Sequence, residues 1–384
     1  MDFDLTDDQR LLREGVDRLL ANEYGFERRK AIVSGAEGWS RPLWRQLAEL
    51  GLLALPFPEE VGGLGGGAVD LMLVMEAFGR YLVVEPFLAS IVLAGGCLRC
   101  GASAAQRAGW MPQLIAGERL LALAHGERGA RYDLARVVTR ARRSGDEWIL
   151  DGSKAFVPGG AAADQFVVSA RTSGADAESE GISLFLVDAD AKGLTRRSYL
   201  TQDRSRAADI ELRSVRLGAD RLIGTEGAAH GVIAQVMDEA IAAVCAEAVG
   251  AMERAHEITV EYLKQRKQFG VTIGSFQALQ HRAVDMLVQI EQARSMMYYA
   301  TMMVGNEDAT IRARALSAAK VQIGRSGKFV GEQAVQLHGG IGVTEECQAG
   351  HYYRRLTMIE LAFGDTAHHL AALAAAGGVP DLSG

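Results

Sequence analysis

The period of the hydrophobic pattern changes twice along this 384-residue chain, and these changes constrain the fold more than any single motif. Residues 1–119 have helical periodicity, residues 120–226 contain short runs rich in β-branched and aromatic residues, and residues 227–384 return to long helical segments. We therefore predict three domains with these boundaries in an α+β protein: an N-terminal α-helical domain, a middle β-barrel and a C-terminal four-helix bundle.

Local signals predict where the elements begin and end. Thr6 and Gln9 fit a capping box at the start of a helix, and further helices are expected at 42–50, 69–81 and 88–99. Short strands are expected at 120–125, 137–141, 148–151, 166–170, 182–187 and 210–215. Between them, 172–181 is expected to be an exposed hairpin or loop and 196–209 a solvated connection. The bundle helices are expected at 231–267, 275–304, 308–336 and 352–376.

Composition and charge argue against several classes of protein. The net charge of −7 lacks the positive footprint of a nucleic-acid-binding protein, so an anionic ligand would need a local basic patch. No apolar run approaches the ~20 residues of a membrane span, and the acidic start of the chain does not resemble a signal peptide. Four cysteines in a chain of this length do not make a disulfide framework, so we expect a protein of the reducing cytoplasm.

A first motif lies where the first bundle helix is expected to end. In the run EYLKQRKQFGVTIGSFQALQ, residues 261–280, the spaced positions are Tyr262, Arg266, Gln268, Phe269, Gly270, Phe276 and Gln277. One interpretation is structural: the cations of the last turn offset the helix dipole, and Gly270 is the C′ residue with positive φ. The other interpretation is a ligand-binding site, and it is favoured only by resemblance to a known family.

A second motif, QLHGGIG at residues 336–342, follows the third bundle helix. It fits a helix C-cap with a glycine-rich turn. It equally fits a turn whose glycines let backbone N–H groups approach a ligand closely.

With these two motifs the chain resembles the acyl-CoA dehydrogenase family of flavoenzymes over nearly its whole length. The resemblance implies the same domain order, an acyl-CoA substrate, an FAD cofactor, and electron transfer to an electron-transferring flavoprotein. It also implies a dimer or tetramer formed through the C-terminal bundle, in which the second motif meets the adenosine part of a neighbouring subunit's FAD. The implied FAD contacts are Arg266, Gln268, Phe269, Phe276, Gln277, Gln336, Gly339, Gly340, Thr366 and His368.

In the middle block the resemblance is incomplete. The residues that match the family pattern T-E-P-x-x-G-S-D are Glu127, Gly129 and Asp133. The family pattern has a threonine at two positions beside the flavin, and this chain has Gly126 and Pro158 there. Neither residue has a hydroxyl group. Proline also has no N–H to donate, and Tyr132 stands at the serine position. The sequence therefore puts in doubt this chain's own site for the flavin ring.

The catalytic base is also missing from its usual places. Removing an α-proton from a thioester requires a carboxylate near the substrate. The family's usual Glu lies before G-T near the C-terminus, and the aligned residue here is Gly364. An alternative position on the first bundle helix corresponds to Ala240 and Ile241. Asp365 is the remaining candidate for the base, and a helix cap is the other interpretation of it.

Other polar residues suggest no second site. Glu239 and Glu247 are expected to be exposed or interfacial, because a buried carboxylate is costly unless it is paired. Cys97 and Cys100 have no partner pair at metal-ligand spacing, and the adjacent His368 and His369 would diverge by ~100° on a helix, so no metal site is expected.

The combination of retained and missing parts resembles one branch of the family, the pimeloyl-CoA-dehydrogenase-like small subunits of α2β2 enzymes. The leading hypothesis is therefore a subunit that contacts FAD but lacks its own base, and that works with a second acyl-CoA dehydrogenase subunit. Three alternatives stay open: a self-sufficient acyl-CoA dehydrogenase that uses Asp365 or a relocated carboxylate, a flavin oxidase or oxygenase on the same fold, and a catalytically silent scaffold.

Overall fold

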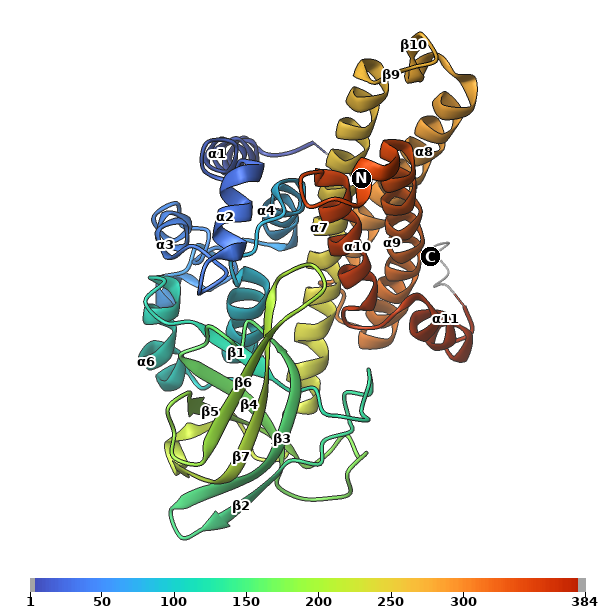
Figure 1. Cartoon of the computed structure of the whole chain (residues 1–384). Coiled ribbons are helices and arrows are strands. Elements are labelled where there is room, and N and C mark those ends of the chain that lie inside the picture. Colours follow the sequence, from blue (N-terminus) through green and yellow to red (C-terminus); the bar gives the residue numbers. More distant parts are fainter. Residues whose placement is uncertain (1–3, 379–384) are drawn as a thin grey trace. The chain divides into compact units, whose positions relative to one another are not determined.

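The computed structural model describes residues 4–378, and the chain divides into two compact units. The bundle unit comprises Met1–Ala31, Ala68–Val83 and Ile241–Gly384. The β unit comprises Ile32–Gly67 and Val84–Ala240. Figure 1 shows the elements of both units, coloured along the chain.

The N-terminal third of the chain is helical, as predicted. Helix α1 (Asp7–Glu23) begins at the expected capping box: Gln9 N–H donates to Thr6 Oγ1 at 3.2 Å, and Thr6 N–H donates to the Gln9 side chain at 3.1 Å. The further elements are α2 (Phe26–Ser34), α3 (Arg41–Glu49), η1 (Glu59–Val61), α4 (Ala68–Tyr81), η2 (Leu88–Gly95), α5 (Gly96–Gly101) and α6 (Ala104–Ile115). The helix expected at 88–99 consists of a π-helical stretch, η2, continued by α5.

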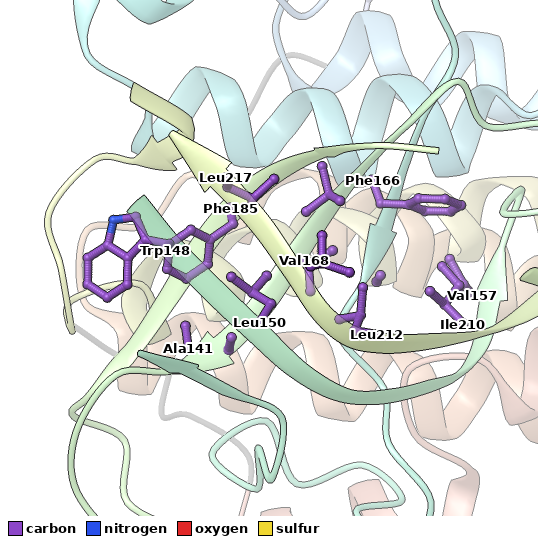
Figure 2. Packing of buried hydrophobic residues seen from close by; sticks show 14 of the residues in the cluster. Ala141, Trp148, Leu150, Val157, Phe166, Val168, Phe185, Ile210, Leu212 and Leu217 are labelled. Atoms are coloured by element: carbon purple, nitrogen blue, oxygen red, sulfur yellow. The ribbon is translucent and has the colours of Figure 1, made fainter. Parts of the chain in front are cut away.

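An eight-stranded sheet forms the centre of the β unit. Its strands are β1 (Leu121–Ala124), β2 (Arg140–Ser144), β3 (Glu147–Pro158), β4 (Gln165–Arg171), β5 (Ile182–Asp188), β6 (Leu194–Leu200), β7 (Arg206–Gly218) and β8 (Leu222–Ile223). The strand order is β6-β7-β3-β2-β4-β5-β8, and β1 pairs in parallel with β4. Trp148, Phe166 and Phe185 pack in its buried apolar cluster, which Figure 2 shows. The predicted β domain is therefore confirmed.

One prediction within this sheet is wrong. Residues 196–209 were expected to form a solvated connection, but most of β6 and the start of β7 lie there. The two strands are antiparallel, with Arg196 opposite Ile210 and Arg197 opposite Asp209. Strand β6 is an edge strand with mostly exposed side chains, so its sequence has no apolar alternation to reveal it.

The segment 172–181, expected to be an exposed hairpin or loop, is organised around a buried arginine. Arg171, at the end of β4, is 1% exposed, and its guanidinium donates to six backbone carbonyls. Those carbonyls belong to Ala135, Val137, Ser173, Asp176, Glu178 and Glu180. Because buried carbonyl groups need donors, this one side chain fixes the loop backbone against the segment that precedes β2.

The C-terminal third contains the helices of the bundle. They are α7 (His230–Gln265), α8 (Gln277–Met303), α9 (Ala309–His338), α10 (Gln348–Leu361) and α11 (Thr366–Ala375). A short hairpin of β9 (Lys267–Gln268) and β10 (Val271–Thr272) joins α7 to α8, followed by the 3-10 turn η4 (Ile273–Ser275). The 3-10 turn η5 (Gly339–Val343) follows α9.

The single helix expected at 352–376 is wrong, because the chain breaks between α10 and α11. Phe363 and Gly364 have φ values of +57° and +118° at the break, and neither value is compatible with a continuous α-helix. None of the helices in residues 4–378 is long and apolar enough to cross a membrane.

Two glycines lie at a close helix crossing in the bundle unit. A Cβ added at Gly250 of α7 would lie 1.9 Å from the carbonyl oxygen of Glu76 on α4, and one added at Gly79 would lie 1.8 Å from that of Glu247. The two backbones therefore touch directly, because neither glycine has a side chain to separate them.

Candidate functional site

The first motif forms a β-hairpin at the end of α7. Helix α7 ends at Gln265, and Ile273 N–H closes the hairpin by donating to the Arg266 carbonyl at 2.8 Å. Phe269 and Gly270 occupy the two turn positions, with φ values of +53° and +80°. Two positive φ values are the signature of a type I′ hairpin turn, so Gly270 is a turn residue and not the helix C′ residue that the structural interpretation expected.

The hairpin presents its aromatic side chains to solvent. Phe269 is 90% exposed and Phe276 is 38% exposed, and their rings make an edge-to-face contact with centroids 6.2 Å apart. Arg266, Gln268 and Gln277 are exposed as well. An almost fully exposed phenylalanine on a strained turn gains nothing for the folded chain alone, so the hairpin is suited to contact a ligand or a second chain.

The second motif lies beside the first. The buried ring of His338, the last residue of α9, stacks on Tyr262 of α7 with centroids 4.5 Å apart. Gln336 is exposed, and a Cβ added at Gly339 or Gly340 would meet no atom within 4 Å. The backbone of this turn is therefore open to a ligand, and the stacked rings hold it next to the hairpin.

The residues of the α10–α11 turn occupy a different part of the bundle unit. Lys320 of α9 donates to the carbonyls of Glu360 and Gly364, each at 2.9 Å. Lys320 precedes Gln336 by 16 residues on the same helix, a distance of about 24 Å at 1.5 Å per residue. Thr366 and His368 follow the turn held by Lys320, whereas the β9–β10 hairpin lies next to the C-terminal end of α9. The two groups of residues are therefore at different places along α9.

Within this turn, Asp365 is a helix cap. Its Oδ1 accepts a hydrogen bond from His368 N–H at 2.8 Å at the start of α11. Thr366 N–H donates to Glu360 Oε1 at 2.9 Å, and a Cβ added at Gly324 would lie 2.6 Å from Thr366 Oγ1, so the threonine hydroxyl faces α9. His368 is exposed and makes an edge contact with the buried ring of His369. The capping geometry corresponds to the structural interpretation of Asp365.

In the β unit, a buried lysine and a glutamate organise the segment that begins at Gly126, which the resemblance places beside the flavin ring. The buried Lys154 Nζ donates to Glu127 Oε1 at 2.6 Å, to Ser169 Oγ at 2.9 Å and to the His125 carbonyl at 3.3 Å. Glu127 in turn accepts from two backbone N–H groups, those of Val138 and Thr139. Burial lowers the pKa of Lys154 to about 8. Burial alone would raise the pKa of Glu127, but Lys154 and these donors hold it below its usual value.

The groups that would face the flavin ring differ from this retained scaffold. Gly126 and Pro158 supply no hydroxyl, and Phe156 is 47% exposed at a φ of +52°. Its N–H donates to Oδ1 of Asp209 at 3.2 Å. Arg197 at 2.8 Å and Tyr199 at 3.0 Å also donate to Asp209. Asp209 was not predicted from the sequence, because its donors come from other segments of the chain and leave no signal in the local pattern.

One expected surface carboxylate is buried. Glu247 of α7 is 3% exposed, and Arg355 of α10 donates to both of its oxygens, at 2.6 and 2.7 Å. The expectation of an exposed or interfacial role for Glu247 is therefore wrong; the bidentate pair compensates the burial of its charge. Glu239 is partly buried and pairs with Arg99.

Buried neutral histidines predict an acid-sensitive fold. Burial lowers the pKa of His125 to about 3 and that of His369 to about 4, with Lys154 and Lys320 adding to the effect respectively. In the unfolded chain each of these histidines binds a proton near pH 6.5, whereas in the folded chain it stays neutral. The free energy of unfolding therefore decreases as the pH falls below that value, by up to about 1.4 kcal/mol per pH unit for each histidine. Denaturant unfolding at pH 7, 6 and 5 measures this slope. A His369→Gln variant should show a shallower slope, and an unchanged slope would contradict the assignment.

The residues present fit one half of FAD and not the other. An exposed arginine fork, an open glycine turn and two exposed phenylalanine rings suit a pyrophosphate and an adenosine. Neither Gly126 nor Pro158 has a side-chain donor for a flavin ring, and Gly364 has no carboxylate.

Comparison with known proteins identifies the family. Three family models match in succession: the acyl-CoA dehydrogenase N-terminal domain at residues 6–118, the middle domain at 122–215 and the C-terminal domain at 230–378. The short-chain specific acyl-CoA dehydrogenase of Homo sapiens mitochondria is 29% identical over 326 residues, which cover 83% of this chain and 78% of that protein.

Two solved structures of paired proteins are similar over nearly the full length. The Tcur3481-Tcur3483 steroid ACAD variant has a TM-score of 0.86 and 30% identity, covering 96% of this chain and 97% of that one. The ChsE4-ChsE5 complex of Mycobacterium tuberculosis has a TM-score of 0.86 and 27% identity, covering 99% and 100%. With all three domains matched in order and the fold reproduced throughout, the chain belongs to the acyl-CoA dehydrogenase family of FAD-dependent oxidoreductases.

Proposed function

We propose that this chain is the base-lacking subunit of a heteromeric acyl-CoA dehydrogenase, of the kind represented by the pimeloyl-CoA dehydrogenase small subunits. One observation carries the proposal: the adenosine-side motifs are intact and exposed, whereas the base position is a glycine enclosed by its own turn. An acyl-CoA dehydrogenase that works alone needs a carboxylate at its base position as well as the motifs that bind adenosine. This chain has the motifs and no carboxylate at that position.

In this proposal FAD lies in a seam between subunits. Arg266 holds the pyrophosphate, Gln268 and Gln277 supply polar contacts, and Phe269 and Phe276 cover the cofactor from solvent. The open backbone at Gly339 and Gly340 receives the adenosine part beside Gln336. When bound, FAD supplies the acceptor for the hydride that leaves the β-carbon of the acyl thioester. Thr366 and His368 follow the turn that Lys320 holds, far along α9 from Gln336, and in this proposal they belong to this chain's own degenerate site.

Exposed apolar side chains on the adjoining helix support a second subunit. Val284, Leu287 and Val288 of α8 are 57%, 45% and 47% exposed, and they lie on neighbouring turns of one helix. An apolar ridge of this kind is typical of a protein–protein contact. The similarity to the Tcur3481-Tcur3483 and ChsE4-ChsE5 structures supports a heteromeric partner.

The partner has to supply what this chain lacks. It must carry the carboxylate that removes the α-proton and the hydrogen-bond donors for the flavin ring. The substrate is an acyl-CoA, and the similarity to a steroid ACAD includes a steroid side-chain thioester among the candidates. Electron-transferring flavoprotein as acceptor, a cytoplasmic setting and domain boundaries at 119/120 and 226/227 belong to the same proposal.

Flavin stoichiometry tests the proposal directly. The chain is purified alone and after co-expression with a second acyl-CoA dehydrogenase subunit, and flavin per chain is measured by absorbance. We expect little flavin in the isolated chain, and one flavin for each pair of unlike chains in the assembly. One full flavin per chain with dehydrogenase activity in the isolated protein would reject the proposal.

The self-sufficient enzyme makes a different prediction. It needs Asp365 or a relocated carboxylate as the base, and the Asp365 carboxylate already accepts the His368 N–H as an N-cap. Bleaching of bound flavin by an acyl-CoA in the absence of a partner, abolished in Asp365→Asn, would favour it over the heteromeric enzyme.

A further inference from the structure

The empty base position invites the idea of an open cavity that a carboxylate has vacated. The structure shows the opposite environment at Gly364, which is buried. A Cβ added there would lie 2.5 Å from Nε2 of His369 and 2.7 Å from Cδ2 of His368. Its φ of +118° is also a conformation that L-residues with a side chain rarely adopt.

Two buried side chains hold this turn in place. His369 lies between the Ser317 hydroxyl, 3.0 Å from Nδ1, and the Phe363 carbonyl, 3.2 Å from Nε2. Lys320, 1% exposed, donates to the Glu360 and Gly364 carbonyls. The ammonium thus satisfies carbonyls at the C-terminal end of α10 and in the turn itself.

We propose that the α10–α11 turn is a closed plug, in which His369 fills the space beside Gly364 and Lys320 locks the backbone. This inference rests on the proposed function for the alignment of Gly364 with the base. It adds that the chain has lost the room for a base as well as the carboxylate. In this proposal the base that an acyl-CoA meets therefore comes from the partner's site and not from position 364 of this chain.

The plug explains why replacing one residue does not rebuild an active site. A Gly364→Glu variant must displace His369, and it places a side chain on a backbone conformation that L-residues rarely adopt. We expect no flavin bleaching by acyl-CoA at this chain's own site in that variant.

A double-mutant cycle on unfolding tests the plug without using activity. Gly364→Ala in the full chain is expected to lower the unfolding temperature by several degrees. Gly62→Ala is the matched control, because Gly62 has a φ of +87° but open space around its Cα. Gly62→Ala should lower the unfolding temperature less, since it places a side chain on a residue with positive φ but meets no neighbouring atom.

The cycle is completed in the His369→Ala background. There the extra loss caused by Gly364→Ala, beyond that of Gly62→Ala, should become smaller, because the nearer of the two histidine rings that oppose the new Cβ is gone. Lys320→Met should destabilise the chain and also speed amide hydrogen exchange over 360–366, an effect that loss of a distant contact would not produce.

The plug would be overturned if Gly364→Ala lowered the unfolding temperature no more than Gly62→Ala does. It would also be overturned if the destabilising effects of the substitutions at 364 and 369 were simply additive. A third contradicting result is amide hydrogen exchange over 360–366 that is unchanged in Lys320→Met. These outcomes are independent of flavin content. A chain that binds one flavin alone but shows the coupling would sink the heteromeric proposal and leave the plug standing.

Discussion

Arg266→Ala is expected to weaken FAD binding by the heteromeric assembly about 10- to 100-fold, because a charge-assisted contact to a phosphate contributes about 1.5–3 kcal/mol. Arg266 is exposed at the base of the hairpin and has no acidic partner among the ion pairs of the described chain. Removing it should therefore change ligand affinity without changing the fold. Titration of the flavin-free assembly with FAD, followed by flavin fluorescence, measures the loss.

Two variants make this experiment decisive. Arg266→Lys keeps the charge but not the planar fork, so it should fall between the wild-type chain and Arg266→Ala. Lys264→Ala removes a neighbouring exposed cation from the last turn of α7 and should leave affinity nearly unchanged. Equal losses for Arg266→Ala and Lys264→Ala would mean that only general positive charge matters, and the specific pyrophosphate contact would be disproved.

Gly250→Ala is expected to be among the most damaging small substitutions in the bundle unit. The new Cβ would lie 1.9 Å from the Glu76 carbonyl oxygen, and both groups belong to helix backbones that cannot turn aside. Helices α4 and α7 would have to separate, which costs about 1–3 kcal/mol or more. Denaturant unfolding followed by circular dichroism gives the free energy.

Gly15→Ala in α1 is the matched control. It lies inside a helix of the same unit, and a Cβ added there meets nothing within 4 Å. It should stabilise the protein by about 0.5–1 kcal/mol, since alanine loses less backbone entropy in a helix. If both substitutions shift the unfolding free energy in the same direction, the crossing at Gly250 is not as tight as these distances require.

The local elements were largely predictable because their signals are local. The capping box at Thr6 involves atoms three residues apart, and the strands of the β-unit core show themselves by β-branched and aromatic residues. Strand β6 was missed since its side chains are exposed, and the break before α11 was missed because Phe363 adopts a left-handed conformation that its residue type does not indicate.

The candidate site divides in the same way. Spacing and resemblance singled out Arg266, Gln336 and the absent base at Gly364 from residue identity alone. Tyr262 stacks on His338, which is 76 positions away in the sequence, and Lys320 donates to the carbonyl of Gly364, which is 44 positions away. The period of the hydrophobic pattern does not predict contacts over such separations. The burial of Glu247 depends in the same manner on Arg355, which comes from another helix.

By itself the sequence determined the order of helical and β regions, the residues that the family resemblance proposes for FAD, and the glycine at the position where the resemblance expects the base. Those properties follow from residue type and spacing. Only the tertiary structure decided that the hairpin aromatics stay exposed, that Asp365 caps a helix and that two histidine rings enclose Gly364. These depend on which distant side chains are brought within a few ångströms, because packing and hydrogen bonding act between neighbours in space.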